Sequence, residues 1–191
     1  MQPQVAFAKT FMDSYSQLPK GQQKRARDLI EKFQKDPESP GINFERIAGA
    51  ADDKVRSLRV DQAYRAIVVH PPKGDVYLYV WVANHDDAYD WVRNKRFEVN
   101  PRSGIFQLYD MDVVDAPSLL PSEAPTNFEQ STSRSPGLFD SQDDEDLLLI
   151  GVPQPLLPTV RALKTEAQFE ALAPYLPEDA AEMLLMLAAG Y

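Results

Sequence analysis

The chain has 191 residues, of which 43% are hydrophobic, and its formal net charge at pH 7 is −9. It contains no cysteine, which excludes a disulfide framework and a thiolate metal site. No segment approaches the roughly 20 apolar residues that a membrane span requires, and the N-terminus lacks the long apolar region of a signal peptide. We therefore expect a soluble, cytoplasmic protein with no membrane partner.

The charge is unevenly distributed along the chain. Residues 1–97 hold 16 Lys and Arg against 13 Asp and Glu, a net charge of +3. Residues 98–191 hold 4 against 16, a net charge of −12. This asymmetry indicates different roles for the two halves, although an acidic half that only keeps the protein soluble would give the same numbers.

The first half predicts an α+β domain over residues 3–97. Hydrophobic periodicity and turn residues indicate a short strand, two helices, three strands and a further helix. The predicted ranges are, in chain order, 5–8, 9–18, 20–35, 55–60, 64–70, 76–84 and 86–95. Because the turns between the three later strands are tight, these strands should form an antiparallel meander with the two N-terminal helices packed on it.

The second half predicts three further segments. An extra hairpin is expected over 98–116, with GIFQLYD pairing with MDVVD, and residues 117–146 form an acidic linker rich in Pro and Ser. Residues 147–191 predict a small helical bundle. Thr165 and Gln168 match a capping box at the start of one of its helices.

Two arginines are predicted to face each other at the turn between the first two strands of the meander. If the turn DQA closes a three-residue hairpin, Arg59 lies directly across from Arg65, with both side chains on one face. Like charges so placed are unfavourable unless an anion or a carboxylate lies between them, and the guanidinium group binds phosphate oxygens in pairs. The third strand ends at His85, which shares one side of a helix start with Tyr89.

These four residues form a candidate catalytic site for RNA cleavage. His85 would move the proton during attack by a 2′-hydroxyl. Arg59 and Arg65 would offset the charge on the phosphorane, and Tyr89 would stack on a base or donate a hydrogen bond. The other predicted nucleic-acid contacts are basic residues of the first half: Lys24, Arg27, Lys54 and Arg56.

Purely structural roles would also explain these residues. Arg65 would then pair with Asp61 or Asp87. His85 would be an ordinary residue at a helix start, and Tyr89 would anchor the core. Two histidines without thiols give no recognisable metal site, and no Walker A, G-x-S-x-G or H-E-x-x-H motif occurs, so no metal or other cofactor is predicted.

The stretches RSLRVDQAYRAIVV and VYLYVWVANHDDAY, in this order of elements, resemble the RelE/ParE toxin superfamily over about residues 3–97. Toxins of this type carry basic residues on the second strand, a tyrosine–arginine pair at the start of the third, and Arg or His at the end of the fourth. Arg59, Arg65 and His85 fall on these positions, and Tyr89 lies near the usual late tyrosine. The resemblance implies a RelE-like fold, mRNA cleavage on the ribosome and an antitoxin-like partner.

A second resemblance covers nearly the whole chain. The run HDDAYDWVRNKRFEVNPRSG looks like the N-terminal region of certain large bacterial UvrD/Rep-like DNA helicases, and LPEDAAEMLLMLAAGY looks like the segment that joins this region to the ATPase core. This resemblance implies a front-end module whose partner is a helicase core. It does not imply unwinding by this chain, because the ATPase motifs are missing.

Three functional hypotheses follow. We prefer a RelE-like module that docks a helicase onto nucleic acid, RNA or DNA, or onto the ribosome or polymerase. The second hypothesis is a ribosome-dependent mRNA endoribonuclease. The third is a non-catalytic protein-interaction domain in which the acidic tail covers the basic face of the same chain.

Overall fold

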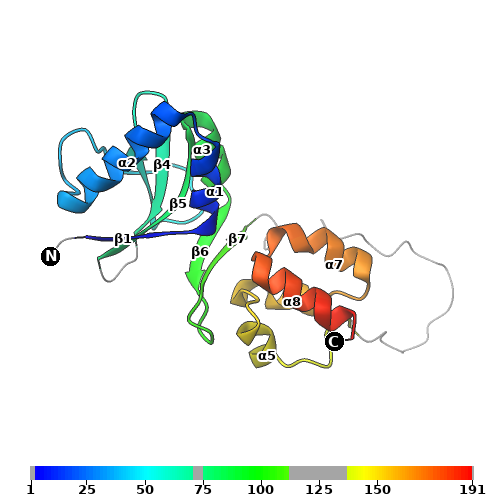
Figure 1. Cartoon of the computed structure of the whole chain (residues 1–191). Helices are drawn as coiled ribbons and strands as arrows, with labels where there is room; N and C mark the ends of the chain where they lie inside the picture. Colours follow the sequence, from blue (N-terminus) through cyan, green and yellow to red (C-terminus); the bar gives the residue numbers. More distant parts are fainter. Residues whose placement is uncertain (1–2, 71–74, 112–136, 191) are drawn as a thin grey trace. The chain divides into compact units, whose positions relative to one another are not determined.

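The computed structural model describes residues 3–70, 75–111 and 137–190. The chain divides into two compact units, residues 1–95 and 96–191 (Figure 1). A five-stranded sheet with helices forms the first unit, and a two-stranded sheet with short helices forms the second. The predicted α+β class is therefore confirmed.

The sheet of the first unit has the strand order β1–β5–β4–β3–β2. The elements of this unit are β1 (Gln4–Phe7), α1 (Lys9–Gln17), α2 (Lys20–Lys35), β2 (Glu45–Arg46), β3 (Val55–Arg59), β4 (Tyr64–Val69), β5 (Val76–Asn84) and α3 (His85–Val92). β3, β4 and β5 form the predicted antiparallel meander. β1 pairs with β5 in parallel, so the expectation of an antiparallel sheet is corrected at this edge.

α1 and α2 cover one face of the sheet, and the hydrophobic core of the unit lies between these helices and the sheet. α2 buries Ala26, Leu29 and Phe33, which are spaced three and four residues apart and therefore share one side of the helix. They pack against apolar side chains from α1, from the residue that follows it and from the strands, namely Phe11, Leu18, Leu58, Ala66, Val68, Tyr79 and Val82. Burial of side chains of this size stabilises the fold by about 1.5–3 kcal/mol each, which fixes the helices on this face.

α1 also completes the outer edge of β5 where β1 has ended. Pairing between β1 and β5 stops at Tyr79, and β5 then has an irregularity at Val80 in its pairing with β4. Beyond this point Thr10 Oγ1 donates to the Val80 carbonyl oxygen at 2.7 Å, and the Val82 N–H donates to Ser14 Oγ at 3.1 Å. Thr10 and Ser14 are one helical turn apart, so one side of α1 satisfies backbone groups that no strand reaches.

α3 begins directly where β5 ends and lies on the other face of the sheet. The Asn84 side chain caps it by accepting a hydrogen bond from the Asp87 N–H at 3.0 Å. We predicted a helix over residues 86–95, but α3 ends at Val92 because the residues from Lys95 onwards enter a strand. Ala88 and Val92 are buried and fix the helix on the sheet.

The hairpin of the second unit differs from the predicted one. β6 (Lys95–Val99) pairs with β7 (Phe106–Asp110), so GIFQLYD pairs with KRFEV. Most of the expected partner MDVVD lies outside the described residues. The strand KRFEV was missed because its basic residues match a helix C-terminus, although Phe97, fully buried, alternates with charged neighbours as in a half-buried strand.

Short helices around one apolar core complete the second unit. They are α5 (Asp144–Leu149), η2 (Gln154–Leu156), α6 (Leu157–Arg161), α7 (Glu166–Leu172), η3 (Ala173–Tyr175) and α8 (Glu178–Ala188). The capping box is confirmed in its main bond, since Thr165 accepts from the Gln168 N–H at 3.3 Å. Residues 117–136 of the expected linker lie outside the described part, but Phe139 is 1% exposed and α5 begins at Asp144, so its last ten residues belong to packed structure.

Candidate nucleic-acid interface

β3 and β4 place two arginines next to each other at one end of the sheet. Arg59 lies directly across from Arg65, and Arg65 lies across from Ala83 on β5. Arg59 lies two positions after Ser57 on β3, and Arg65 lies across from Arg59. The side chains of both arginines therefore emerge on the face of the sheet that carries α3. The pairing register is the one that the short turn predicted.

Both arginines donate hydrogen bonds to the same backbone oxygen. Arg65 Nη1 lies 2.8 Å from the Asp61 carbonyl oxygen, and Arg59 Nε lies 3.4 Å from it. Arg65 Nη1 also contacts the Tyr64 carbonyl oxygen at 3.0 Å. Arg65 therefore contacts the main chain of Asp61, and the alternative of an ion pair with Asp61 or Asp87 is wrong.

The two guanidinium groups keep unused donors. A carbonyl oxygen carries only a partial charge, and within the described residues neither Arg59 nor Arg65 meets a carboxylate. Arg59 uses Nε alone, and Arg65 uses Nη1 alone, so the remaining N–H groups stay available. Two adjacent and partly buried cations with free donors form a site that suits an oxyanion.

The Asp61 carboxylate holds the turn that carries this oxygen. It accepts hydrogen bonds from the N–H groups of Ala63 at 2.8 Å and Tyr64 at 2.9 Å, and it pairs with Arg25 of α2 at 2.5 Å. Burial raises the pKa of the Asp61 carboxyl, but these hydrogen bonds and one from Gln22 outweigh burial, so its pKa lies below the ordinary value. Asp61 is thus ionised at neutral pH and fastens the turn to α2.

His85 and Tyr89 form a second pair at the start of α3. Their rings stack with centroids 4.4 Å apart and planes inclined by 19°. His85 Nδ1 lies 2.9 Å from Asp86 Oδ1, and the Tyr89 hydroxyl lies 3.1 Å from Ser57 Oγ. The His85 side chain is 47% exposed. Its Nε2 takes part in no hydrogen bond within the described chain, and so it is available to a ligand.

The four predicted catalytic residues thus fall into two pairs on one face. Tyr89 connects them indirectly, because its hydroxyl bonds Ser57, two residues before Arg59 on β3. No hydrogen bond among the described residues joins an arginine to His85. Ser57 was not predicted, although strict alternation along β3 places it on the face of Arg59.

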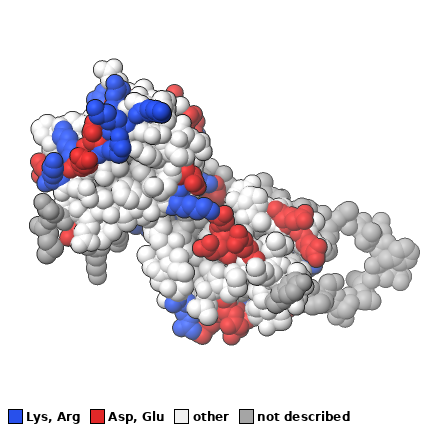
Figure 2. Space-filling view, in the orientation of Figure 1, with Lys and Arg blue, Asp and Glu red and all other residues white. Residues whose placement is uncertain are grey.

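The other predicted contacts lie away from the arginine pair. Lys24 and Arg27 are exposed on α2, which packs on the opposite face. Figure 2 shows Lys and Arg side chains gathered over the part of the first unit that carries α2. Arg56 points to the face opposite Arg59 and donates to two carbonyl groups near the start of β3. Lys54 pairs with Asp52 at 3.3 Å, at the far end of that strand.

The described residues include no group of three or more His, Asp or Glu that could hold a metal ion. Among their helices, none has both the length and the apolar character needed to cross a membrane.

Comparisons with known proteins give structural neighbours only. No protein-family model and no curated protein matches the chain. A chain of a RelB–RelE antitoxin–toxin complex from Methanococcus jannaschii is similar at 23% identity and a TM-score of 0.38, over 46% of this chain and 98% of that chain. A YoeB/ParE toxin from Agrobacterium tumefaciens is similar at 15% identity and a TM-score of 0.36, over 43% of this chain and 98% of that chain. An archaeal RelE–RelB complex from Pyrococcus horikoshii is similar at 20% identity and a TM-score of 0.36, over 44% of this chain and 96% of that chain.

Proposed function

We propose that the first unit binds the sugar-phosphate backbone of a nucleic-acid strand through Arg59 and Arg65. The observation that supports this function is the facing register of the two guanidinium groups, with unused N–H donors and no carboxylate partner in the described chain. A phosphate placed between them would relieve the repulsion of like charges and accept hydrogen bonds from both. The stacked rings of His85 and Tyr89, on the same face, would receive a base of a single strand.

Substitution of the two arginines tests this proposal. Arg59→Gln and Arg65→Gln each remove one charged contact, so we expect single-stranded RNA to bind about 5- to 20-fold more weakly in each variant, whatever its sequence. Fluorescence anisotropy with a labelled RNA measures the affinity. Arg46→Gln, on the exposed edge strand β2, is the matched control and should change the affinity by less than about twofold. Equal losses in all three variants would mean that only net charge matters.

A ribosome-dependent endoribonuclease is the second candidate function. The exposed His85, with a free Nε2 on the arginine face, supports it. If the site cleaves, His85→Ala should lower the cleavage rate of ribosome-bound mRNA at saturating protein by about 10²- to 10⁴-fold, beyond any loss of RNA affinity that follows from removing one ring of the stacked pair. Primer extension on cellular mRNA measures the cleavage. Uncut messages after expression of the unsubstituted chain would remove this candidate and leave the binding function intact.

Two protein partners belong to the proposal on the strength of the sequence resemblances alone. They are a UvrD-type helicase core and an antitoxin-like protein. In the docking hypothesis the nucleic-acid site brings the helicase to its substrate. A binding assay between this chain and a UvrD-type helicase core tests that partner, and the absence of binding at micromolar concentration would contradict it.

A further inference from the structure

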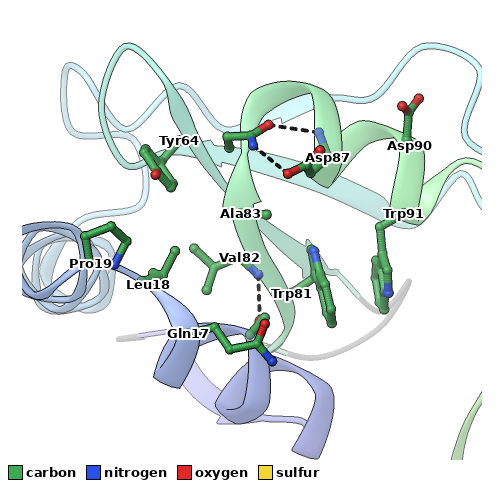
Figure 3. Close-up of a pocket in the computed structure, with 12 residues that line it drawn as sticks. Gln17, Leu18, Pro19, Tyr64, Trp81, Val82, Ala83, Asp87, Asp90 and Trp91 are labelled. Carbon is green, nitrogen blue, oxygen red and sulfur yellow. Dashed lines mark hydrogen bonds between the residues drawn. The ribbon is translucent and has the colours of Figure 1, made fainter.

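A groove with a volume of about 470 Å³ follows the outer edge of β5 in the first unit. It lies between the C-terminal end of α1 and the exposed side of α3, beyond the point where β1 stops pairing with β5 (Figure 3). Aliphatic, aromatic and acidic side chains line it, among them Leu18, Tyr64, Trp81, Val82, Asp87 and Trp91. The groove is distinct from the arginine pair, because neither Arg59 nor Arg65 lines it.

Two stacked tryptophans form one wall of the groove. The ring centroids of Trp81 and Trp91 are 4.5 Å apart and their planes are inclined by only 6° (Figure 3). The face of an indole ring carries negative potential and attracts cations. The indole N–H of Trp81 is shielded from solvent and has no acceptor within the described residues, so the wall offers a ligand its aromatic face and not this donor.

The rim of the groove is acidic, and one of its two carboxylates has no cationic side chain as a partner within the described residues. The Asp87 carboxylate has one side-chain partner in the described part of the chain, the neutral Asn84 amide at 2.5 Å. Asp90 is paired with Arg93 at 2.6 Å. Of the described residues that line the groove, none is Lys or Arg. Within the described residues, no cationic side chain therefore pairs with Asp87 beside the electron-rich aromatic wall.

We propose that this groove binds an arginine or lysine side chain presented by a protein partner. A guanidinium group can lie flat against an indole ring while its edge donates to a carboxylate, so the Trp81 face and Asp87 would act on it together. The same charge would repel a phosphate group, which favours a basic protein segment over a nucleic-acid backbone in this groove. The first unit would then have separate surfaces for nucleic acid and for a basic protein segment.

The chain contains its own reporter for this interaction. Its only two tryptophans are Trp81 and Trp91, so all tryptophan fluorescence comes from the wall of the groove. We expect a short peptide of alternating Arg and Gly to produce a saturable change in this fluorescence at low salt. The same peptide with citrulline in place of each arginine keeps the shape and loses the charge, and it should bind at least about tenfold more weakly.

Matched variants separate this groove from the general attraction of an acidic protein for a cationic peptide. Asp87→Asn should lower the affinity for the Arg–Gly peptide about 3- to 10-fold. Asp53→Asn removes the same charge from an exposed residue before β3 and should change the affinity by less than about twofold. Gln17 is an exposed residue of the groove lining. Gln17→Arg places a positive charge there and should also lower the affinity for the peptide. Because Gln17 belongs to α1, this variant tests the groove without altering α3.

Several results would overturn the proposal. They are equal affinity for the citrulline peptide, equal losses in the Asp87 and Asp53 variants, or unchanged binding in the Gln17 variant. A fluorescence change caused by RNA that is insensitive to Asp87→Asn and persists when Arg59 and Arg65 are both replaced by Gln would assign the groove to nucleic acid instead. None of the variants tested with the peptide alters Arg59 or Arg65. A negative result for the groove therefore does not contradict the proposed phosphate site, and a negative result for the phosphate site does not contradict the groove.

Discussion

Asp61 joins three parts of the candidate site through one residue. Its carbonyl oxygen orients Arg59 and Arg65, and its carboxylate accepts from the turn backbone and from Arg25. The pKa of this carboxyl is lowered in the fold. A lowered pKa means that ionisation of Asp61 stabilises the folded state. This contribution to the free energy of unfolding is fully present above the unfolded pKa of about 3.9. It disappears as the pH falls through the pKa of the folded state.

Asp61→Asn should therefore destabilise the first unit at neutral pH and not in acid. We expect a loss of about 1–2 kcal/mol in the free energy of unfolding near pH 7, because charge-assisted hydrogen bonds are replaced by neutral ones. The difference should shrink as the pH falls below about 3.9 and through the lowered pKa of Asp61. Urea unfolding followed by tryptophan fluorescence measures it. Asp13→Asn, at an exposed position of α1, is the control, and an Asp61 effect independent of pH would contradict this assignment.

The sequence predicted which side chains share the face but not what they contact. Alternation along β3 and the length of the turn were enough to place Arg59 opposite Arg65. The bond to the Asp61 carbonyl oxygen could not be predicted, because every residue has a carbonyl group and only the turn geometry selects one. The cap at Asn84 was missed for a different reason, since Asn also fits an ordinary strand end.

At the scale of elements, the contact between α1 and β5 decides how the sheet edge is closed. Ser14 Oγ donates to the Phe11 carbonyl oxygen and accepts from the Val82 N–H. Ser14→Ala removes that acceptor from a buried N–H group, so we expect a loss of about 1–3 kcal/mol in the free energy of unfolding. Ser16 makes the same bond to its own helix at an exposed position, and Ser16→Ala should cost less than about 0.5 kcal/mol. Similar values for the two variants in urea unfolding would contradict this role of Ser14.

Periodicity identified the helices and the meander of the first unit because their apolar positions repeat without interruption. α2 buries every third or fourth residue, and β5 is a long apolar run. The hairpin of the second unit was placed wrongly because KRFEV has only one large buried side chain, Phe97. The parallel pairing of β1 also has no local signature, since partner and direction depend on residues about 70 positions away.

For the whole molecule, the separation of charge makes a prediction about the acidic half. Residues 98–191 carry −12 and should repel nucleic acid from the first unit. A fragment of residues 1–95, one of the two compact units, should therefore bind RNA more tightly than the whole chain at low salt. The advantage should fade at high salt as the charges are screened. Equal affinities at low salt would contradict both this repulsion and the hypothesis that the acidic tail covers the basic face.

The salt dependence of RNA binding tests the central claim most directly. The slope of the logarithm of the binding constant against the logarithm of salt concentration counts the phosphates that the protein neutralises, at about 0.7 per phosphate for a single strand. Arg59→Gln combined with Arg65→Gln should make this slope shallower by about 1.4 relative to the unsubstituted chain. An unchanged slope in the double variant would show that neither arginine contacts phosphate.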